Sequence, residues 1–205
     1  MARTIRQVEF IWDFVSTPCY IAWKCLEPMV KAAGGEVVKT PVFCGGIFKA
    51  TGNAGPLVIP AKRNWYARDL ALWAKRRRVP FAPSPHIPVR SLPLMRGVLL
   101  AEERGEAQPY GDAVFDAIYV YQRNLSDLAV VKDTLREKGL DVEAYMKGIE
   151  RIDIKEHLTR NTEQAVSRGV FGVPSFFVGD ELFFGQDRIE FAIEALQGVQ
   201  DPKPG

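Results

Sequence analysis

The stretch from Trp12 to Cys25 reads WDFVSTPCYIAWKC, and it decides the fold. An apolar, aromatic run passes into a helical pattern through the turn Ser16–Cys19, which reads STPC. The turn has the spacing of a redox C-x-x-C motif at a helix start, but serine replaces the outer, attacking cysteine. Only the inner cysteine, Cys19, is present, so the chain cannot run a two-thiol cycle by itself. The turn is therefore a helix cap or a site for the thiol of another molecule.

The pattern around this turn predicts a β-α-β unit. Residues 8–15 alternate and then become mainly apolar and aromatic, which is typical of a strand whose later part is buried on both faces. A helix over 18–33 follows, with Pro18 in its first turn and Gly34-Gly35 as its stop. Residues 36–43 are rich in valine and phenylalanine and form the second predicted strand.

The middle of the chain changes to helical patterns. Two loops rich in glycine or proline are expected, over 45–60 and over 79–88. Ser126 and Asp141 are expected to cap the fourth and fifth of a series of helices. The predicted helices of this series cover 65–77, 92–104, 113–121, 126–138 and 141–149.

The C-terminal part returns to β structure after a helix over 154–168. Two short strands, 175–178 and 181–184, flank Gly179-Asp180, which is a strong hairpin signal. A final amphipathic helix covers 188–196.

The order of these elements is β-α-β, a helical block, then α-β-β-α. This order predicts an α/β protein with a thioredoxin-like fold and an all-α insertion in its middle. Residues 1–45 and 155–205 are expected to form the thioredoxin-like domain. Residues 46–154 are expected to form the helical insertion domain.

Composition and charge exclude several classes of function. A net charge of +2 over 205 residues does not call for a nucleic-acid partner. The N-terminus has no apolar leader, and no apolar run approaches the ~18 residues of a membrane span, so no membrane association is expected. Three cysteines are an odd number, which favours a reduced, cytoplasmic protein. His86 and His157 are far apart and outside any metal motif, so no metal site is predicted.

Two residues of the STPC turn each fit two roles. Ser16 can cap the helix by accepting a backbone N–H, or its hydroxyl and the helix N-terminus can together stabilise an anion such as a thiolate. Cys19 can be a small buried helix residue or can form a mixed disulfide.

Two further segments carry candidate chemistry. In GVFGVPSFF (169–177), Pro174 stands just ahead of a strand, where thioredoxin folds place a cis-proline opposite the N-terminus of the first helix. The residue before it, Val173, would then present its backbone to an extended ligand. In FFGQDR (183–188), Gln186 and Asp187 can cap the last helix, or Asp187 and nearby N–H donors can capture the α-amino group and carboxylate of a ligand.

Three motifs carry a resemblance to a known family. They are DFVSTPCYIA (13–22), GGIFKATGN (45–53) followed by IPAK (59–62), and GVFGVPSFFVGDELFFGQDR (169–188). In order and spacing the chain resembles bacterial 2-hydroxychromene-2-carboxylate isomerases and kappa-class glutathione transferases, which are similar to DsbA-type oxidoreductases in fold. The insertion domain is therefore expected to be DsbA-like. The chain departs from many family members at Thr17, which separates the serine from the proline.

The resemblance implies a glutathione site in the thioredoxin-like half, with Ser16 as the catalytic residue that hydrogen-bonds the sulfur. Lys49 resembles the lysine that meets the carboxylate of the substrate. Trp65, on the same helix as Trp73, and His86 are candidates for the wall of an aromatic substrate pocket. The implied glutathione contacts come from Ser16, Pro18, Asn53, Lys62, Val173, Phe184, Gly185, Gln186 and Asp187.

The implied function is a glutathione-dependent isomerase that interconverts 2-hydroxychromene-2-carboxylate and trans-o-hydroxybenzylidenepyruvate. The alternatives are a kappa-class transferase that conjugates glutathione to electrophiles, a DsbA-like thiol-disulfide oxidoreductase acting through Cys19, and a non-catalytic glutathione-binding protein. The resemblance also implies a homodimer and a small aromatic carboxylate as substrate.

Overall fold

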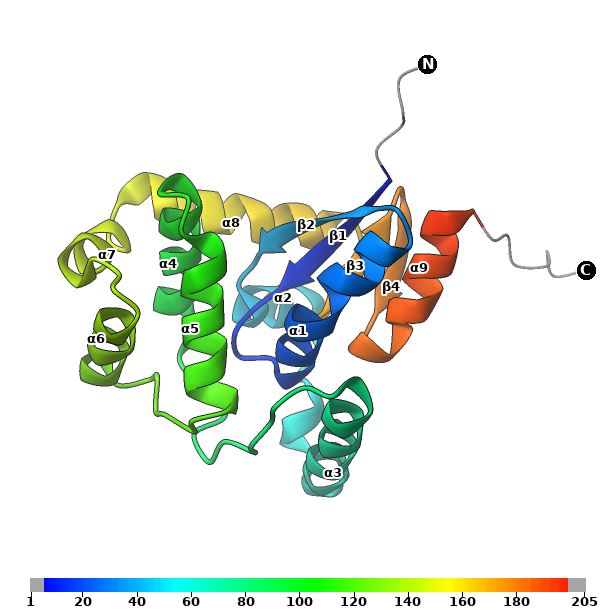
Figure 1. Cartoon of the computed structure of the whole chain (residues 1–205), viewed down its shortest axis with the longest axis horizontal. Helices are drawn as coiled ribbons and strands as arrows, with labels where there is room; N and C mark the ends of the chain where they lie inside the picture. The colour runs from blue at the N-terminus through cyan, green and yellow to red at the C-terminus, as the bar shows by residue number, and fades with distance from the viewer. Residues whose placement is uncertain (1–5, 199–205) are drawn as a thin grey trace, which may run out of the picture.

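A single mixed sheet forms the centre of the protein (Figure 1). The computed structural model describes residues 6–198. The strand order is β2-β1-β3-β4; β1 and β2 are parallel, β3 is antiparallel to β1, and β4 is antiparallel to β3. The strands are β1 (Gln7–Trp12), β2 (Glu36–Pro41), β3 (Ser175–Val178) and β4 (Glu181–Phe184).

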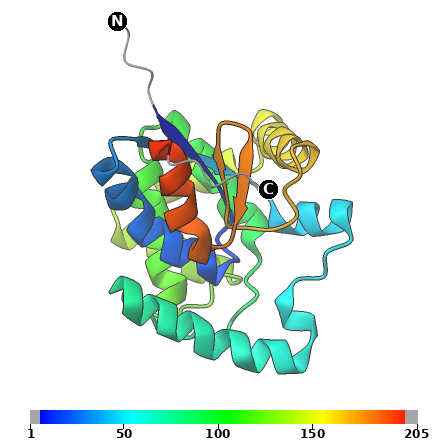
Figure 2. The same cartoon turned by 90° about the vertical axis from the view of Figure 1, so that its right-hand side faces the viewer.

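Helices cover both faces of this sheet. On one face lie α1 (Thr17–Ala32), which is the crossover between β1 and β2, and α9 (Ile189–Gln197) (Figure 2). On the other face lie α2 (Cys44–Thr51) and α8 (Ile152–Ser167). The N-terminus of α1, the N-terminus of α2 and the start of β3 meet at one edge of the sheet, because β1 and β2 both end there.

The insertion adds a group of helices beside α1. In Figure 1, α5 runs alongside α1, while α3 lies below the N-terminal end of α1. None of the helices within residues 6–198 is long and apolar enough to cross a membrane. The remaining elements are η1 (Pro56–Val58), α3 (Pro60–Arg77), α4 (Ser91–Glu103), α5 (Ala107–Tyr119), α6 (Leu128–Glu137), α7 (Val142–Gly148) and η2 (Gln186–Arg188).

An aromatic cluster joins α5 to the sheet and to α1. The ring of Phe115 lies 5.5 Å from that of Trp12, 4.6 Å from that of Phe14 and 5.3 Å from that of Trp23, measured between centroids. Burying aromatic side chains removes a large apolar area from water, and tilted or edge contacts between them add further stabilisation. The core is therefore continuous across the β1–α1 unit and the insertion.

The predicted fold is confirmed, with local corrections. Two helices begin earlier than predicted, α3 at Pro60 and α5 at Ala107. The predicted loop over 45–60 is wrong at its start, because α2 occupies Cys44–Thr51 and ends at Gly52, which is left-handed. The cap of α6 is Asp127 and not Ser126, since the Asp127 carboxylate accepts the N–H of Ala129 at 2.8 Å. The first strand ends at Trp12, earlier than predicted, because the chain turns at the buried Asp13.

Candidate active site

Ser16 lies at the N-terminus of α1 and faces the loop before β3. Its backbone is extended, and its Oγ accepts a hydrogen bond from the Cys19 N–H at 3.3 Å. The same hydroxyl donates to the carbonyl oxygen of Val173 at 3.0 Å. The cap interpretation of Ser16 is therefore confirmed, and the hydroxyl also joins the helix to the opposite loop.

Val173 precedes a cis peptide bond at Pro174, as the sequence predicts. The carbonyl oxygen of Pro174 accepts the N–H of Gly185 at 2.9 Å, which holds this loop against the turn after β4. Among residues 6–198, no hydrogen bond involves the N–H of Val173. One backbone donor therefore remains beside the Ser16 hydroxyl for a ligand with peptide groups.

The turn after β4 depends on a glycine. Gly185 has φ 102° and ψ 145°, a conformation that side chains rarely adopt. A Cβ at this position would lie 2.5 Å from Oδ1 of Asp187, so the carboxylate folds back over the glycine. Gln186 beside it is 4% exposed, and its Oε1 has no hydrogen-bond partner among the described residues.

Helix α3 brings two residues toward this turn that the sequence did not predict. Burial raises the pKa of Asp69, and the negative charge of Asp187 raises it further. The same helix carries the half-buried Tyr66, whose pKa is raised by burial and, to a smaller extent, by Cys19, Asp69 and Asp187. Two carboxylates that repel one another in this way form a favourable environment for an ammonium group.

Asn53 connects the loop after α2 to the loop before β3. Its Nδ2 donates to the carbonyl oxygen of Phe171 at 2.8 Å, and its Oδ1 accepts the N–H of Gly55 at 2.9 Å. Phe171 and Phe184, each 42% exposed, form a pair with ring centroids 4.5 Å apart. Asn53 and Phe184 thus both contact Phe171 in the loop before β3, and their contact with glutathione stays a prediction.

Four predicted site residues are exposed, and their contact with a ligand stays a prediction. Lys62 is exposed in the first turn of α3, and Trp65 on the same helix is 62% exposed. His86 is exposed in the proline-rich loop, where its N–H donates to Ser84 Oγ. Lys49 is exposed on α2 and lines a hollow between α2, α4 and α8 that shares no lining residue with the Ser16 turn.

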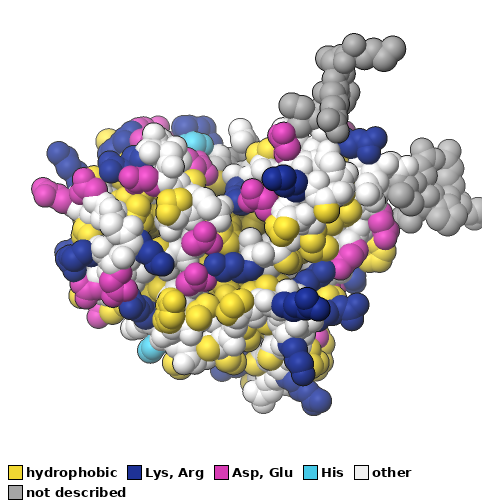
Figure 3. All heavy atoms as spheres, viewed as in Figure 1, with side chains coloured by type: hydrophobic (Ala, Val, Ile, Leu, Met, Phe, Trp, Pro, Cys, Tyr) yellow, Lys and Arg dark blue, Asp and Glu magenta, His cyan; other side chains and the backbone are white. Residues whose placement is uncertain are grey.

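The surface over α3 combines apolar and basic side chains. Val58, Ile59 and Leu72 are 59%, 45% and 59% exposed beside Trp65. In Figure 3, apolar atoms and Lys or Arg side chains lie side by side in the lower part of the view, where α3 is found. Trp65 is therefore a surface residue.

All three cysteines are free and buried. Cys19 is 0% exposed, and burial raises the pKa of its thiol well above the usual value. Burial also raises the pKa of Cys25 to about 11 and that of Cys44 to about 12. Neutral, inaccessible thiols are poor nucleophiles, which favours the interpretation of Cys19 as a packing residue.

Thr17, which separates Ser16 from Pro18, has a partner in the insertion. Thr17 lowers the pKa of Tyr119 against the larger effect of burial, so the two side chains are neighbours, and the Tyr119 hydroxyl donates to the carbonyl oxygen of Phe14 at 2.8 Å. The extra residue of the turn is thus tied to α5.

The comparisons with known proteins agree with this geometry. The family described as DSBA-like thioredoxin domain matches residues 7–197. The 2-hydroxychromene-2-carboxylate isomerase of Pseudomonas putida is 27% identical over 194 residues, covering 93% of this chain and 94% of that protein. Glutathione S-transferase kappa 2 of Caenorhabditis elegans is 24% identical over 217 residues, covering 96% of each chain.

A solved structure of a 2-hydroxychromene-2-carboxylate isomerase superposes with a TM-score of 0.82 at 25% identity, covering 94% of this chain and 95% of that one. The family match spans nearly the whole chain, including the Ser16 turn, the cis-proline loop and the turn at Gly185. The chain therefore belongs to the family of DSBA-like thioredoxin domain proteins.

Proposed function

We propose that the protein is a glutathione-dependent isomerase that interconverts 2-hydroxychromene-2-carboxylate and trans-o-hydroxybenzylidenepyruvate, or a close analogue. The observation that carries the proposal is Ser16 at the α1 N-terminus, facing the cis-proline loop, above a buried and neutral Cys19. A site built for a thiolate that lacks a reactive thiol of its own requires one from a ligand. The likeness to isomerases and to kappa-class transferases points to glutathione.

The residues around Ser16 fit the three parts of glutathione. The N–H of Val173 is available to the backbone of its cysteine residue. Asp187 and Asp69 suit its α-ammonium group, and Asn53 and Lys62 are further contacts of the proposal. The catalytic role of Ser16 does not depend on Lys49, which lines a different hollow.

When bound, glutathione would supply a thiolate that adds reversibly to the ring-opened substrate, so that a double bond becomes single, rotation occurs about that single bond, and the double bond forms again as the thiolate leaves. Ser16 directs its hydroxyl hydrogen to the sulfur by turning it away from the carbonyl oxygen of Val173. A hydroxyl that donates to the anionic form lowers the pKa of the thiol. The N-terminus of α1 acts in the same direction, because its dipole favours negative charge.

A kappa-class transferase that conjugates glutathione to electrophiles is the second candidate. It would use the same thiolate but release the adduct, and the similarity to the kappa 2 transferase favours it. An oxidoreductase acting through Cys19 is disfavoured, since that thiol is buried and its pKa is raised. A catalytic assay with hydroxychromene carboxylate, with and without glutathione, beside a conjugation substrate, decides between isomerase and transferase.

Replacing Ser16 tests the proposal directly. Calorimetry should show glutathione binding to the wild type, with a thiolate absorbance that is lost or shifted to higher pH in Ser16→Ala. The control is Ser126→Ala. The Oγ of Ser126 also accepts a backbone N–H near a helix start, that of Arg90 at 3.0 Å, but Ser126 lies in the insertion. Absence of binding at millimolar glutathione, or equal thiolate absorbance in both variants, would contradict the proposal.

The proposal extends to a homodimer in the cytoplasm that acts on a small aromatic carboxylate. Sedimentation equilibrium at several protein concentrations measures the oligomeric state. A mass equal to that of one 23.0 kDa chain at all concentrations would contradict the dimer.

A further inference from the structure

A groove of about 560 Å³ lies between α2, α4 and α8, on a part of the surface that the proposed glutathione site does not use. α8 contributes side chains at successive turns of one face, among them Lys155, Leu158 and Thr162. α2 approaches α8 closely at Gly46, where a Cβ would lie 3.1 Å from Cγ2 of Thr162.

The walls of the groove are largely apolar. The groove is lined by Phe43, Leu92, Leu158 and Val166. Of these, Phe43, Leu92 and Val166 are only partly buried by the rest of the chain. Phe43 is held in place because its N–H donates to Thr162 Oγ1 at 2.9 Å. Partly exposed apolar walls favour a ligand with an apolar body, since binding removes that area from water.

Cations from all three helices line the same groove: Lys49 from α2, Arg96 from α4 and Lys155 from α8. Glu163 is the acidic side chain among the lining residues, so positive charge prevails. Lys155 is paired with Glu150 at 2.6 Å. The Nε of Arg96 is buried and has no hydrogen-bond partner among residues 6–198. The charge of Arg96 also helps to lower the pKa of Glu150, so Glu150 lies near both cations, but it does not accept the Nε hydrogen. A buried guanidinium donor without an acceptor can be satisfied by an anionic ligand.

We infer that this groove is a binding site for a small amphipathic organic anion, with a carboxylate head held by Arg96 and Lys155 and a flat or branched apolar body against Phe43 and Leu158. Glutathione does not match this chemistry, because it carries an ammonium group and lacks a large apolar part. The site is therefore distinct from the one at Ser16, and its occupant binds together with glutathione.

Calorimetry with 2-naphthoate tests this site. We expect saturable binding to the wild type, and binding weaker by about tenfold or more in Arg96→Gln and in Lys155→Gln, as loss of a charge-assisted hydrogen bond requires. Lys147→Gln removes an exposed lysine of α7 outside the groove and should bind as the wild type does. The neutral analogue 2-naphthalenemethanol should bind at least tenfold more weakly than 2-naphthoate.

A second variant keeps the test decisive if Arg96→Gln does not fold. Thr159 is exposed on α8 and lines the groove, so Thr159→Trp should fill it and abolish 2-naphthoate binding without removing a cation. Glutathione at saturating concentration should leave 2-naphthoate binding unchanged. Displacement by glutathione, or equal binding to the wild type, Lys155→Gln and Thr159→Trp, would overturn the inference and leave the proposed isomerase untouched.

Discussion

The side chain of Asp13 is fully buried at the end of β1, directly before the Ser16 turn. Its two oxygens accept the N–H of Val15 at 2.9 Å and the N–H of Cys44 at 2.8 Å. Burial raises the pKa of this carboxyl from 3.8 to about 6, although both backbone hydrogen bonds act in the opposite direction. One carboxylate thus fixes the starts of α1 and α2 relative to each other.

This pKa predicts a pH dependence of stability. Because the folded pKa lies above the unfolded one, the folded chain holds a proton that the unfolded chain releases. The stabilisation from this proton is fully present below about pH 4 and is lost as the pH rises through about 6. The stabilisation amounts to about 3 kcal/mol, because the pKa rises from 3.8 to about 6 and each pKa unit corresponds to ~1.4 kcal/mol.

Urea titrations from about pH 4 to about pH 7 measure this effect. The difference in unfolding free energy between the wild type and Asp13→Asn should fall by about 3 kcal/mol over that range. The exposed Asp180→Asn at the hairpin tip is the matched control and should show no such trend. A constant difference for Asp13→Asn would contradict the assignment.

Gly185 gives a second prediction for a single residue. Gly185→Ala strains the backbone by about 1–3 kcal/mol and drives a Cβ against the Asp187 carboxylate. Since Asp187 belongs to the proposed ammonium site, glutathione binding measured by calorimetry should weaken by about tenfold. Gly179→Ala is the control, because Gly179 also has a positive φ of 60° but no atom within 4 Å of the added Cβ. Equal glutathione affinity in the two variants would contradict the role of Gly185.

The sequence predicted those site residues that belong to contiguous motifs. Ser16, Val173 and Asp187 each lie in a short motif whose turn chemistry can be read locally. Tyr66 and Asp69 are not predicted as site residues, because their positions depend on how α3 packs against α1. Asp13 lies in the motif DFVSTPCYIA, but its role comes from a contact with Cys44 at the start of α2, which the local pattern does not reveal. Residues from separate elements meet only through the tertiary fold, so local patterns do not reveal them.

At the scale of elements, α2 shows where local patterns fail. Its second and third residues, Gly45 and Gly46, are glycines, and its N-cap Phe43 has no side chain that can cap the helix. The helix nevertheless forms, because the buried Asp13 accepts the first N–H of α2, that of Cys44, and Gly46 allows close contact with Thr162 on α8. Tertiary packing overrides propensity here, whereas β1, α1 and the β3–β4 hairpin follow their periodic patterns.

The contact between α1 and α5 also depends on a glycine. In α5, a Cβ at Gly111 would lie 2.4 Å from Cζ2 of Trp23 on α1. Gly111→Ala should therefore cost about 1–3 kcal/mol of stability by overpacking, against a gain of ~1 kcal/mol in helix propensity. Chemical unfolding measures the net loss. Combining it with Trp23→Phe should cost less than the sum of the two single variants, and strict additivity would contradict the contact.

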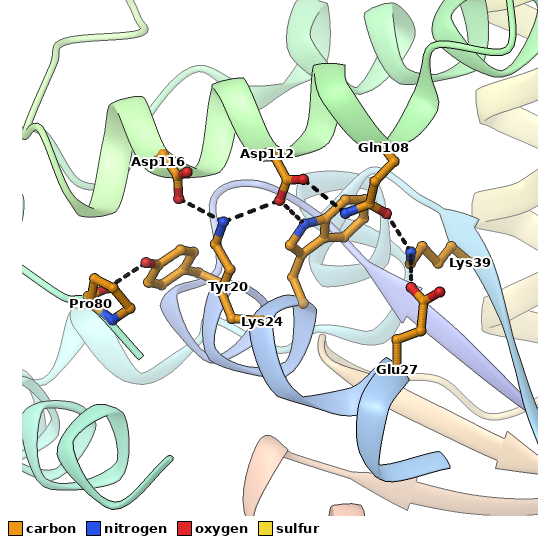
Figure 4. A network of polar contacts seen from close by, with 9 residues as sticks. Tyr20, Lys24, Glu27, Lys39, Pro80, Gln108, Asp112 and Asp116 are labelled. Carbon is orange, nitrogen blue, oxygen red and sulfur yellow. Dashed lines mark hydrogen bonds and ion pairs between the residues drawn. The ribbon is translucent and has the colours of Figure 1, made fainter. Parts of the chain in front are cut away.

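At the scale of the whole molecule, a polar network accompanies this contact (Figure 4). Lys24 on α1 pairs with Asp112 at 3.1 Å and with Asp116 at 2.8 Å, both on α5. Asp112 also accepts hydrogen bonds from Trp23 Nε1 at 2.9 Å and from Gln108 at 3.0 Å. The network is half-buried and connects the parts that we propose as two domains, residues 1–45 with 155–205 and residues 46–154.

The shared core predicts that these two parts fold as one cooperative unit. Phe115 of the insertion is fully buried against Trp12, Phe14 and Trp23, all of which belong to the other part. A separate 46–154 segment would expose this face to water and lose its packing contacts. Removing one buried aromatic side chain typically costs ~3–5 kcal/mol, and the loss here is of that order. That loss is a large fraction of the ~5–15 kcal/mol by which a domain is usually stable.

We therefore expect the excised segment to lack near-UV circular dichroism, and the intact chain to unfold in urea with coincident fluorescence and far-UV transitions. A cooperative thermal transition of the excised segment would show instead that the insertion has a sufficient core of its own.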